Sequence, residues 1–98
     1  MKIEKTEGPG TLALKLTGRL DTNTAPELEA ELGAQLDNVR ELTLDMAELQ
    51  YISSAGLRVL LAAQKRMNRQ GRMRLMSVGE AVMEVFEVTG FADILTIE

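Results

Sequence analysis

The sequence predicts a single α/β domain whose mostly parallel sheet has helices packed against it. Short stretches in which apolar and polar residues alternate are typical of strands. Other stretches, in which apolar residues recur every three or four positions, are typical of helices. The two kinds follow one another in the order β-β-α-β-α-β-α-β. Helices between successive strands imply right-handed crossovers and parallel pairing, and only the first two strands are expected to form an antiparallel hairpin.

Length and composition narrow the range of functions. A chain of 98 residues is expected to form one domain over residues 1–98. It has no cysteine and no histidine, which removes disulfides, thiol nucleophiles, metal sites built on these residues and the commonest general base. The net charge of −4 argues against a nucleic-acid partner. No run is apolar enough for membrane insertion or for a signal peptide, so a cytoplasmic protein is expected.

The first elements of the chain are expected to be the two strands of the hairpin. Residues 2–7 alternate weakly and end at Gly-Pro-Gly, which is a strong turn signal. Residues 11–17 alternate cleanly and carry leucine at every second position on one face. The composition of residues 18–23 predicts a loop.

The first helix is expected to begin at Thr24, which has Glu27 at the spacing of a capping box. Its apolar stripe consists of Leu28, Leu32 and Leu36. The helix is expected to end near residues 37–38. A strand over residues 40–46 follows, and residues 47–51 are expected to be a short connection.

The middle helix is expected to begin at Ser53 or Ser54, because serine is a preferred N-cap residue. Its predicted buried face consists of Gly56, Val59, Leu60, Ala63 and Met67. Gly71 is expected to end the helix, since glycine is the commonest residue just past a helix C-terminus.

The rest of the chain is expected to form a strand over residues 72–76, a third helix and a last strand. Ser77 and Glu80 stand at capping-box spacing and are expected to open the helix. Its inner face is expected to consist of Val82, Val85, Phe86 and Thr89. Gly90 is expected to end it, and the apolar residues within 91–97 predict the final strand.

The start of the middle helix is the candidate functional site. The other two helices have an acid at capping-box spacing, whereas this one has two serines and no acid. The positive end of its dipole therefore carries free N–H groups that favour an anion. A phosphate on Ser53 or Ser54 would occupy that place. The plainer alternative is that the two serines only cap the helix.

Four stretches resemble motifs of the STAS domain family, the family of bacterial anti-sigma factor antagonists. They are Tyr51–Leu57 for the phosphorylation-site motif, Thr17–Asp21 for the loop with the pattern TG-x-LD, Leu42–Met46 for the central strand and Phe86–Phe91 for the C-terminal signature. The resemblance covers nearly the whole chain, and the expected order of elements agrees with the family fold. The helix that usually ends the family fold is expected either to be missing after the last predicted strand or to lie outside this sequence.

The resemblance implies which residues act. In the family the phosphorylated serine commonly follows an aspartate, so Ser54 is the implied phosphoacceptor and Ser53 stands at the aspartate position. Because Ser53 adds a second hydroxyl, modification at Ser53 stays open. The residues implied in partner binding are Asp21, Ser53, Ala55, Gly56 and Leu57. For Asp21 the alternative is a turn or cap aspartate, and Asp45 is expected at a strand end near the same edge.

The function implied by the resemblance is a partner switch without enzymatic activity, cofactor or metal. The unmodified domain binds an anti-sigma factor, typically a GHKL-type serine kinase, and so releases the sigma factor. The kinase phosphorylates the domain to end binding, and a PP2C-type phosphatase restores it. One alternative is a non-phosphorylated STAS binding module of a transport or stress-sensing assembly. Another is an enzyme using Asp21 and Asp45, but no nucleophile–base pair or glycine-rich phosphate loop accompanies them.

Overall fold

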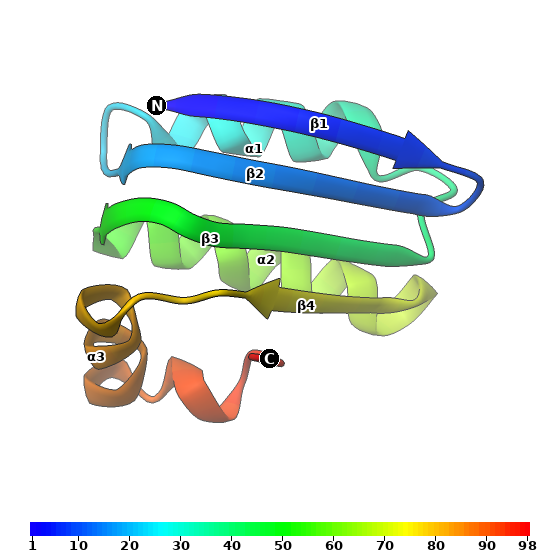
Figure 1. Ribbon diagram of the computed structural model, residues 1–98. Helices are drawn as coiled ribbons and strands as arrows, with labels where there is room; N and C mark the ends of the chain where they lie inside the picture. The colour runs from blue at the N-terminus through cyan, green and yellow to red at the C-terminus, as the bar shows by residue number, and fades with distance from the viewer.

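Four strands form one sheet in the order β1-β2-β3-β4 in the computed structural model, which describes residues 1–98 (Figure 1). The elements in chain order are β1 Lys2–Gly8, β2 Thr11–Leu20, α1 Ala25–Gln35, β3 Glu41–Ile52, α2 Ser54–Gln70, β4 Arg72–Met76, α3 Glu80–Thr89 and the 3₁₀ helix η1 Phe91–Asp93. Strands β1 and β2 are antiparallel, while β2, β3 and β4 run parallel. The predicted α/β class with a mostly parallel sheet is confirmed.

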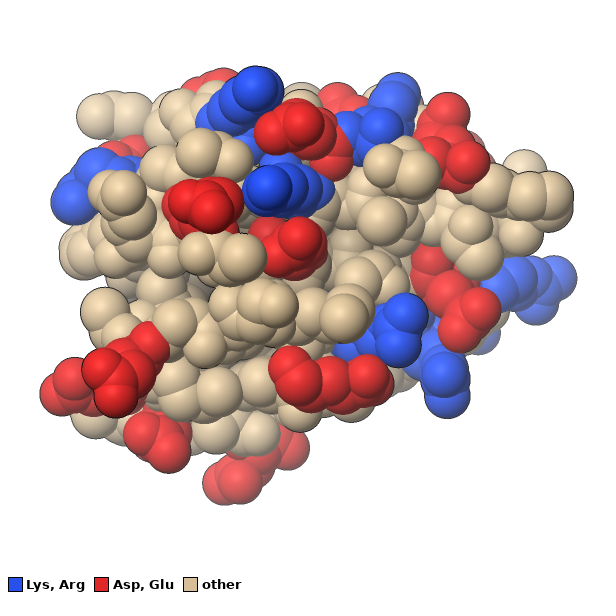
Figure 2. All heavy atoms as spheres, viewed as in Figure 1, with Lys and Arg blue, Asp and Glu red and all other residues tan.

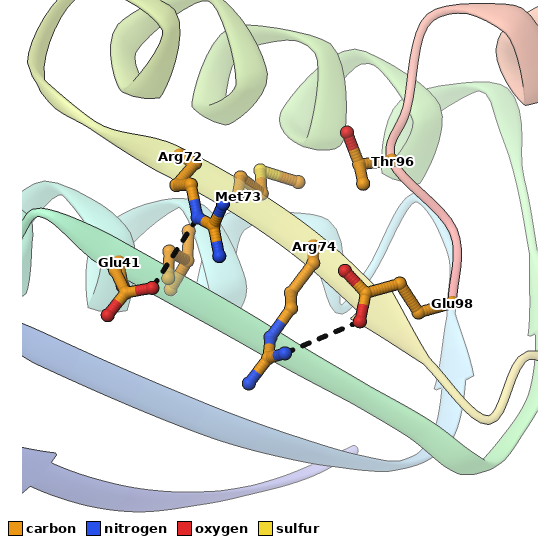
Figure 3. Close-up of a pocket in the computed structure, with 7 residues that line it drawn as sticks. Glu41, Arg72, Met73, Arg74, Thr96 and Glu98 are labelled. Atoms are coloured by element: carbon orange, nitrogen blue, oxygen red, sulfur yellow. Dashed lines mark hydrogen bonds and ion pairs between the residues drawn. The ribbon is translucent and has the colours of Figure 1, made fainter.

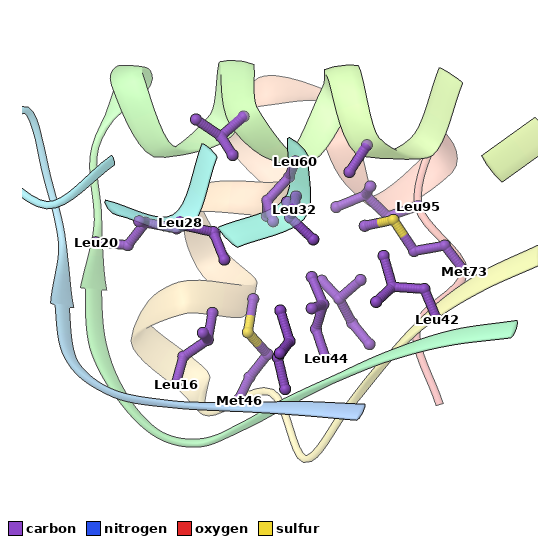
Figure 4. Packing of buried hydrophobic residues seen from close by; sticks show 14 of the residues in the cluster. Leu16, Leu20, Leu28, Leu32, Leu42, Leu44, Met46, Leu60, Met73 and Leu95 are labelled. Carbon is purple, nitrogen blue, oxygen red and sulfur yellow. The ribbon is translucent and has the colours of Figure 1, made fainter. Parts of the chain in front are cut away.

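The core lies between the sheet and the two helices α1 and α2, which cover the same face of it (Figure 1). Alternate residues of β2 and β3 point toward these helices and meet their apolar stripes (Figure 4). The predicted helix faces are confirmed, since every residue of both apolar stripes is buried. They are Leu28, Leu32 and Leu36 of the first stripe, and Gly56, Val59, Leu60, Ala63 and Met67 of the second. The core is almost wholly aliphatic.

Strands β2 and β3 are longer than the sequence pattern predicted. The expected loop at residues 18–20 continues β2, and the expected connection at residues 47–51 continues β3. Two register shifts between these strands each place an extra residue in β3. Such bulges change the spacing of inward-facing residues from two to three, so Met46, Leu49 and Ile52 no longer alternate. The pattern therefore looked like a break in a strand that in fact continues.

Both predicted capping boxes are wrong. Helix α1 has Thr24 at its N-cap, but the side chain makes no capping bond. Its hydroxyl instead donates to the Arg19 carbonyl at 2.7 Å and accepts from the Asp21 N–H at 2.8 Å. Helix α3 begins only at Glu80, with Gly79 as its N-cap, because Ser77 adopts a left-handed backbone with φ of 58°. On α3 itself, Val82 and Phe86 are buried as predicted, whereas Thr89 is exposed.

The predicted last strand is reduced to a single bridge between Leu75 and Ile97. Gly90 adopts a left-handed backbone with φ of 83° and ends α3, and the chain then turns into η1. There the backbone N–H of Leu95 donates to the Phe91 carbonyl at 2.9 Å, a local bond where a strand would bond across the sheet. No helix of the domain is both long and apolar enough to cross a membrane.

Candidate functional site

The carboxyl ends of β2 and β3 meet at one edge of the sheet, on the left in Figure 1. Strand β2 ends there at Leu20 and β3 at Ile52, whereas β4 stops earlier, at Met76 beside Asp45. The loops that follow carry the predicted site residues, Asp21 after β2 and Ser53 after β3. Open α/β sheets place their binding sites at this edge, because the chain leaves the strands there and its polar groups are free.

Two serines at this edge have different roles in the structure. Ser53 has the extended backbone of an N-cap residue, and its Oγ accepts a hydrogen bond from the Gly56 N–H at 3.4 Å. Its carbonyl accepts the first helical bond from the Leu57 N–H at 2.9 Å. Ser54 is the first helical residue, its side chain is exposed, and its hydroxyl makes no hydrogen bond within the chain. The capping task falls to Ser53, and Ser54 presents a free hydroxyl.

Gly56 and Leu57, two of the residues expected to bind the partner, lie in the core of the domain. Leu57 is only 7% exposed, and Gly56 is buried. A Cβ at Gly56 would stand 2.7 Å from Leu20 Cγ and 2.9 Å from Ile52 Cγ1. Glycine is thus needed there because α2 approaches the ends of β2 and β3 closely. Ala55, which is half-buried, stays at the surface.

Asp21 organises the loop between β2 and α1. Its Oδ1 accepts hydrogen bonds from the N–H groups of Asn23 at 2.9 Å and Thr24 at 3.1 Å. These bonds lower the pKa of the Asp21 carboxyl, the Thr24 N–H contributing most, against an opposing effect of burial. The Thr24 hydroxyl and the charge of Arg19 lower the pKa further. The turn interpretation of Asp21 therefore has a structural basis, and its second oxygen, Oδ2, lies 3.8 Å from Arg19 Nε.

The Asp21 loop is tied to the start of α2 by one backbone contact. The N–H of Ser53 donates to the carbonyl of Leu20 at 2.9 Å, and Leu20 directly precedes Asp21. The parallel pairing of β2 with β3 thus brings the two predicted site segments to adjacent positions. Asp21, Ser53, Ser54 and Ala55 form one partly exposed area, which we call the switch edge.

Arg19 and Tyr51 belong to the same edge, although the sequence reasoning did not single them out. They are register partners in β2 and β3, and the Arg19 guanidinium lies over the Tyr51 ring at 4.2 Å from its centroid. Arg19 Nε is also 3.8 Å from Asp21 Oδ2. Tyr51 remains 40% exposed. The sequence pattern placed Arg19 in a predicted loop and Tyr51 in a predicted connection, so it gave no reason to pair them.

Asp45 does not lie where the sequence predicted. It stands within β3, seven positions before that strand ends at Ile52, so it is not part of the switch edge. Its register partners are Lys15 and Met76. Its Oδ1 accepts a hydrogen bond from the Ala47 N–H at 3.0 Å, a local contact beside the first bulge. An acid–base pair of Asp21 with Asp45 therefore has no support in the geometry.

A separate hollow lies along β4, beside which the C-terminal segment runs (Figure 3). Its arginines already have carboxylate partners. Arg72 Nε is 3.5 Å from Glu41 Oε1, and Arg74 NH1 is 3.3 Å from Glu98 Oε1. Because these charges are paired, the hollow offers no free cation to an anionic ligand, and the switch edge remains the stronger candidate.

The family comparison agrees with this geometry. A sequence model of the family described as STAS domain matches residues 2–98. The chain belongs to the STAS domain family. Among the relatives of this STAS domain is BtrV of Bordetella bronchiseptica, which carries a provisional name as an anti-sigma factor antagonist. The two are 41% identical over 99 residues, which cover 99% of this chain and 85% of BtrV.

Solved structures match the fold of this STAS domain closely. An anti-sigma factor antagonist from Mycobacterium paratuberculosis superposes with a TM-score of 0.87 at 23% identity, covering 98% of this chain and 83% of that one. The Bacillus cell fate determinant SpoIIAA, solved in its phosphorylated form, gives 0.77 at 17% identity, covering 99% and 91%. At these identities the likeness shows the fold alone.

Proposed function

We propose that this STAS domain is an anti-sigma factor antagonist whose binding is ended by phosphorylation of Ser54. The observation that carries the proposal is the exposed Ser54 hydroxyl, which makes no hydrogen bond within the chain. The neighbouring Ser53 already caps the helix, so Ser54 is not needed for that role. A hydroxyl in that position is accessible to a kinase without unfolding the helix. The name of the 41% identical BtrV supports the same function.

The proposed partner is an anti-sigma factor that is itself a GHKL-type serine kinase, acting in the cytoplasm. Asp21, Ser53 and Ala55 provide the partly exposed contacts around Ser54, and Arg19 with Tyr51 extends the area. Gly56 and Leu57 support this surface from the core. A PP2C-type phosphatase reverses the modification. The domain acts by binding and carries out no reaction itself.

A phosphate on Ser54 would oppose binding for an electrostatic reason. It adds a charge of roughly −1.5 to −2 and three acceptor oxygens. Burying such a group in an interface without a matching cation costs several kcal/mol or more, on the order of what an unpaired buried charge costs. Helix α3 carries acidic side chains and no basic ones, as seen at the lower left in Figure 2, so it supplies no cation to offset the phosphate. Phosphorylation therefore favours release of the partner.

The test is phosphosite mapping by mass spectrometry after incubation with ATP and candidate serine-kinase anti-sigma factors. The parent protein is compared with the Ser54→Ala and Ser53→Ala variants. A single phosphate on Ser54, lost only in Ser54→Ala, supports the proposal. Phosphate on Ser53 alone would reassign the switch to the other hydroxyl. No phosphate from any candidate kinase would favour the non-phosphorylated binding module instead.

A further inference from the structure

The geometry points to Arg58 as the cation that pairs with a phosphate on Ser54. The inference rests on the proposed function, since it requires that Ser54 is phosphorylated. It adds which side chain of this domain pairs with the charge of the phosphate. Arg58 follows Ser54 by four residues in α2, and both side chains are exposed. Residues at this spacing are neighbours on a helix surface, and an acid placed before a base is the favourable order.

The direction of helical side chains brings the two groups together. Every Cα–Cβ bond in an α-helix is tilted toward the helix N-terminus. A long side chain such as Arg58 therefore lies over the turn that precedes it, which here is the first turn of α2 and carries Ser54. The planar guanidinium can donate two parallel hydrogen bonds to phosphate oxygens.

Arg58 is free to take this role. It takes part in none of the ion pairs or side-chain hydrogen bonds of the domain. Arg66, further along the same helix, is instead held by Asp37 at 2.6 Å. Lys65 and Arg69 are exposed and unpaired as well, but they lie at least three turns from Ser54. Arg58 is thus the one basic residue of α2 within two turns of Ser54.

The surroundings of Arg58 leave room for the movement. A shallow hollow between the starts of α1 and α2 is lined by Thr22, Pro26, Glu29, Ala55 and Arg58. Glu29 of α1 shares this hollow but forms no ion pair with Arg58. Across the helix start, Arg19 is engaged with Tyr51 and Asp21. Asp21 and Glu29 are acidic and Arg19 is already paired, so Arg58 is the cation at the site that has no ion-pair partner.

The consequence is that the phosphorylated domain keeps its fold. The phosphate would be neutralised in part by its own helix, and the partner would be displaced without local unfolding. A nearby cation favours the dianionic form of the phosphate and lowers its second pKa, which is about 6 for phosphoserine. Removing the cation should raise that pKa, and this difference can be measured directly.

The experiment uses the full chain with phosphoserine introduced at position 54 during translation, so that no kinase is needed. The phosphate is titrated by ³¹P NMR at low ionic strength in the parent protein and in the Arg58→Gln, Arg58→Lys, Arg69→Gln and Arg19→Gln variants. We expect the phosphate pKa to rise by about 0.3 to 0.5 pH unit in Arg58→Gln, a two- to threefold change in proton affinity. The phosphate pKa of Arg58→Lys should stay near that of the parent protein. The phosphate pKa of Arg69→Gln should equal that of the parent protein.

Added salt should shrink the difference between the parent and Arg58→Gln, because both groups are exposed. Identical phosphate titrations for the parent and Arg58→Gln would overturn the inference. A rise caused by Arg19→Gln but not by Arg58→Gln would overturn it as well and assign the cation to β2. Partner binding by the same phosphorylated protein tests the proposed function separately. If the phosphorylated protein no longer binds the partner but Arg58→Gln leaves the phosphate pKa unchanged, the proposed switch is supported and only the role of Arg58 is refuted.

Discussion

Gly56 lies so close to Leu20 that a Cβ on the glycine would stand 2.7 Å from the Cγ of the leucine. This contact sets how near the start of α2 can approach the end of β2. The same approach lets the Ser53 N–H reach the Leu20 carbonyl at 2.9 Å, which holds the Asp21 loop beside the two serines. The geometry of the switch edge thus depends on the absence of one side chain in the core.

Gly56→Ala should destabilise the domain by about 1 to 3 kcal/mol, because the new methyl group is forced against well-packed neighbours. Leu20 and Ile52 are 0% and 2% exposed, so neither has free space to move into. Urea unfolding followed by circular dichroism measures the change.

Gly33→Ala is the matched control, since Gly33 lies within α1 and a Cβ there would meet nothing within 4 Å. That variant should gain about 0.5 to 1 kcal/mol from helix propensity. Equal effects of the two substitutions would contradict the packing argument.

Gly71→Ala should be more damaging than Gly56→Ala. A Cβ at Gly71 would overlap the carbonyl oxygen of Arg40, a backbone atom that cannot move like a side chain. That carbonyl also accepts the Arg72 N–H at 2.8 Å, which joins the start of β4 to β3. We expect a loss of more than about 3 kcal/mol, at the upper end of overpacking effects. A midpoint of urea unfolding close to that of the parent would refute this reading.

The Ser53→Ala and Ser54→Ala variants should differ in their free energy of unfolding and in their phosphorylation. Ser53→Ala removes the N-cap and should cost about 0.5 to 1 kcal/mol, the low end for a cap whose hydrogen bond is long. Ser54→Ala removes no hydrogen bond and should change stability by less than about 0.5 kcal/mol. Thermal unfolding of both variants, together with phosphate incorporation, tests the assignment. A larger stability loss in Ser54→Ala would mean that Ser54 is the capping residue.

Asp21 should make stability depend on pH under acidic conditions. Its folded pKa is lowered, chiefly by the Thr24 N–H, so the folded domain releases this proton more readily than the unfolded chain. The stabilisation is therefore fully present above the unfolded pKa of about 3.9 and is lost as the pH falls through the lower folded pKa. Urea unfolding between about pH 2 and pH 7 measures this slope.

Asp21→Asn should flatten that slope, since the amide keeps an acceptor oxygen but does not titrate over this range. Asp21→Ala removes the acceptor as well and should lower stability at neutral pH too, because the N–H groups of Asn23 and Thr24 lose their partner. An unchanged slope in both variants would show that Asp21 contributes nothing to acid sensitivity.

Features that depend on local periodicity could be predicted from the sequence. The leucine stripe of α1 and the apolar face of α2 were predicted because helical spacing repeats regardless of what the helix contacts. The hairpin turn and the end of α2 at Gly71 were predicted because glycine allows backbone conformations that other residues avoid, while proline fixes its own φ. The STAS motifs pointed to the same segment that the structure places at the sheet edge.

Tertiary structure alone decided the rest, since it depends on contacts between distant residues. The bulges that lengthen β3 are set by its register with β2, and they erase the alternation on which strand prediction relies. The last strand yields to a 3₁₀ turn because its backbone groups find partners nearby. Whether Ser53 or Ser54 is free, and whether Gly56 faces a partner or the core, follows from how closely α2 approaches two strands. No local pattern encodes that distance, because both segments must be folded before it exists.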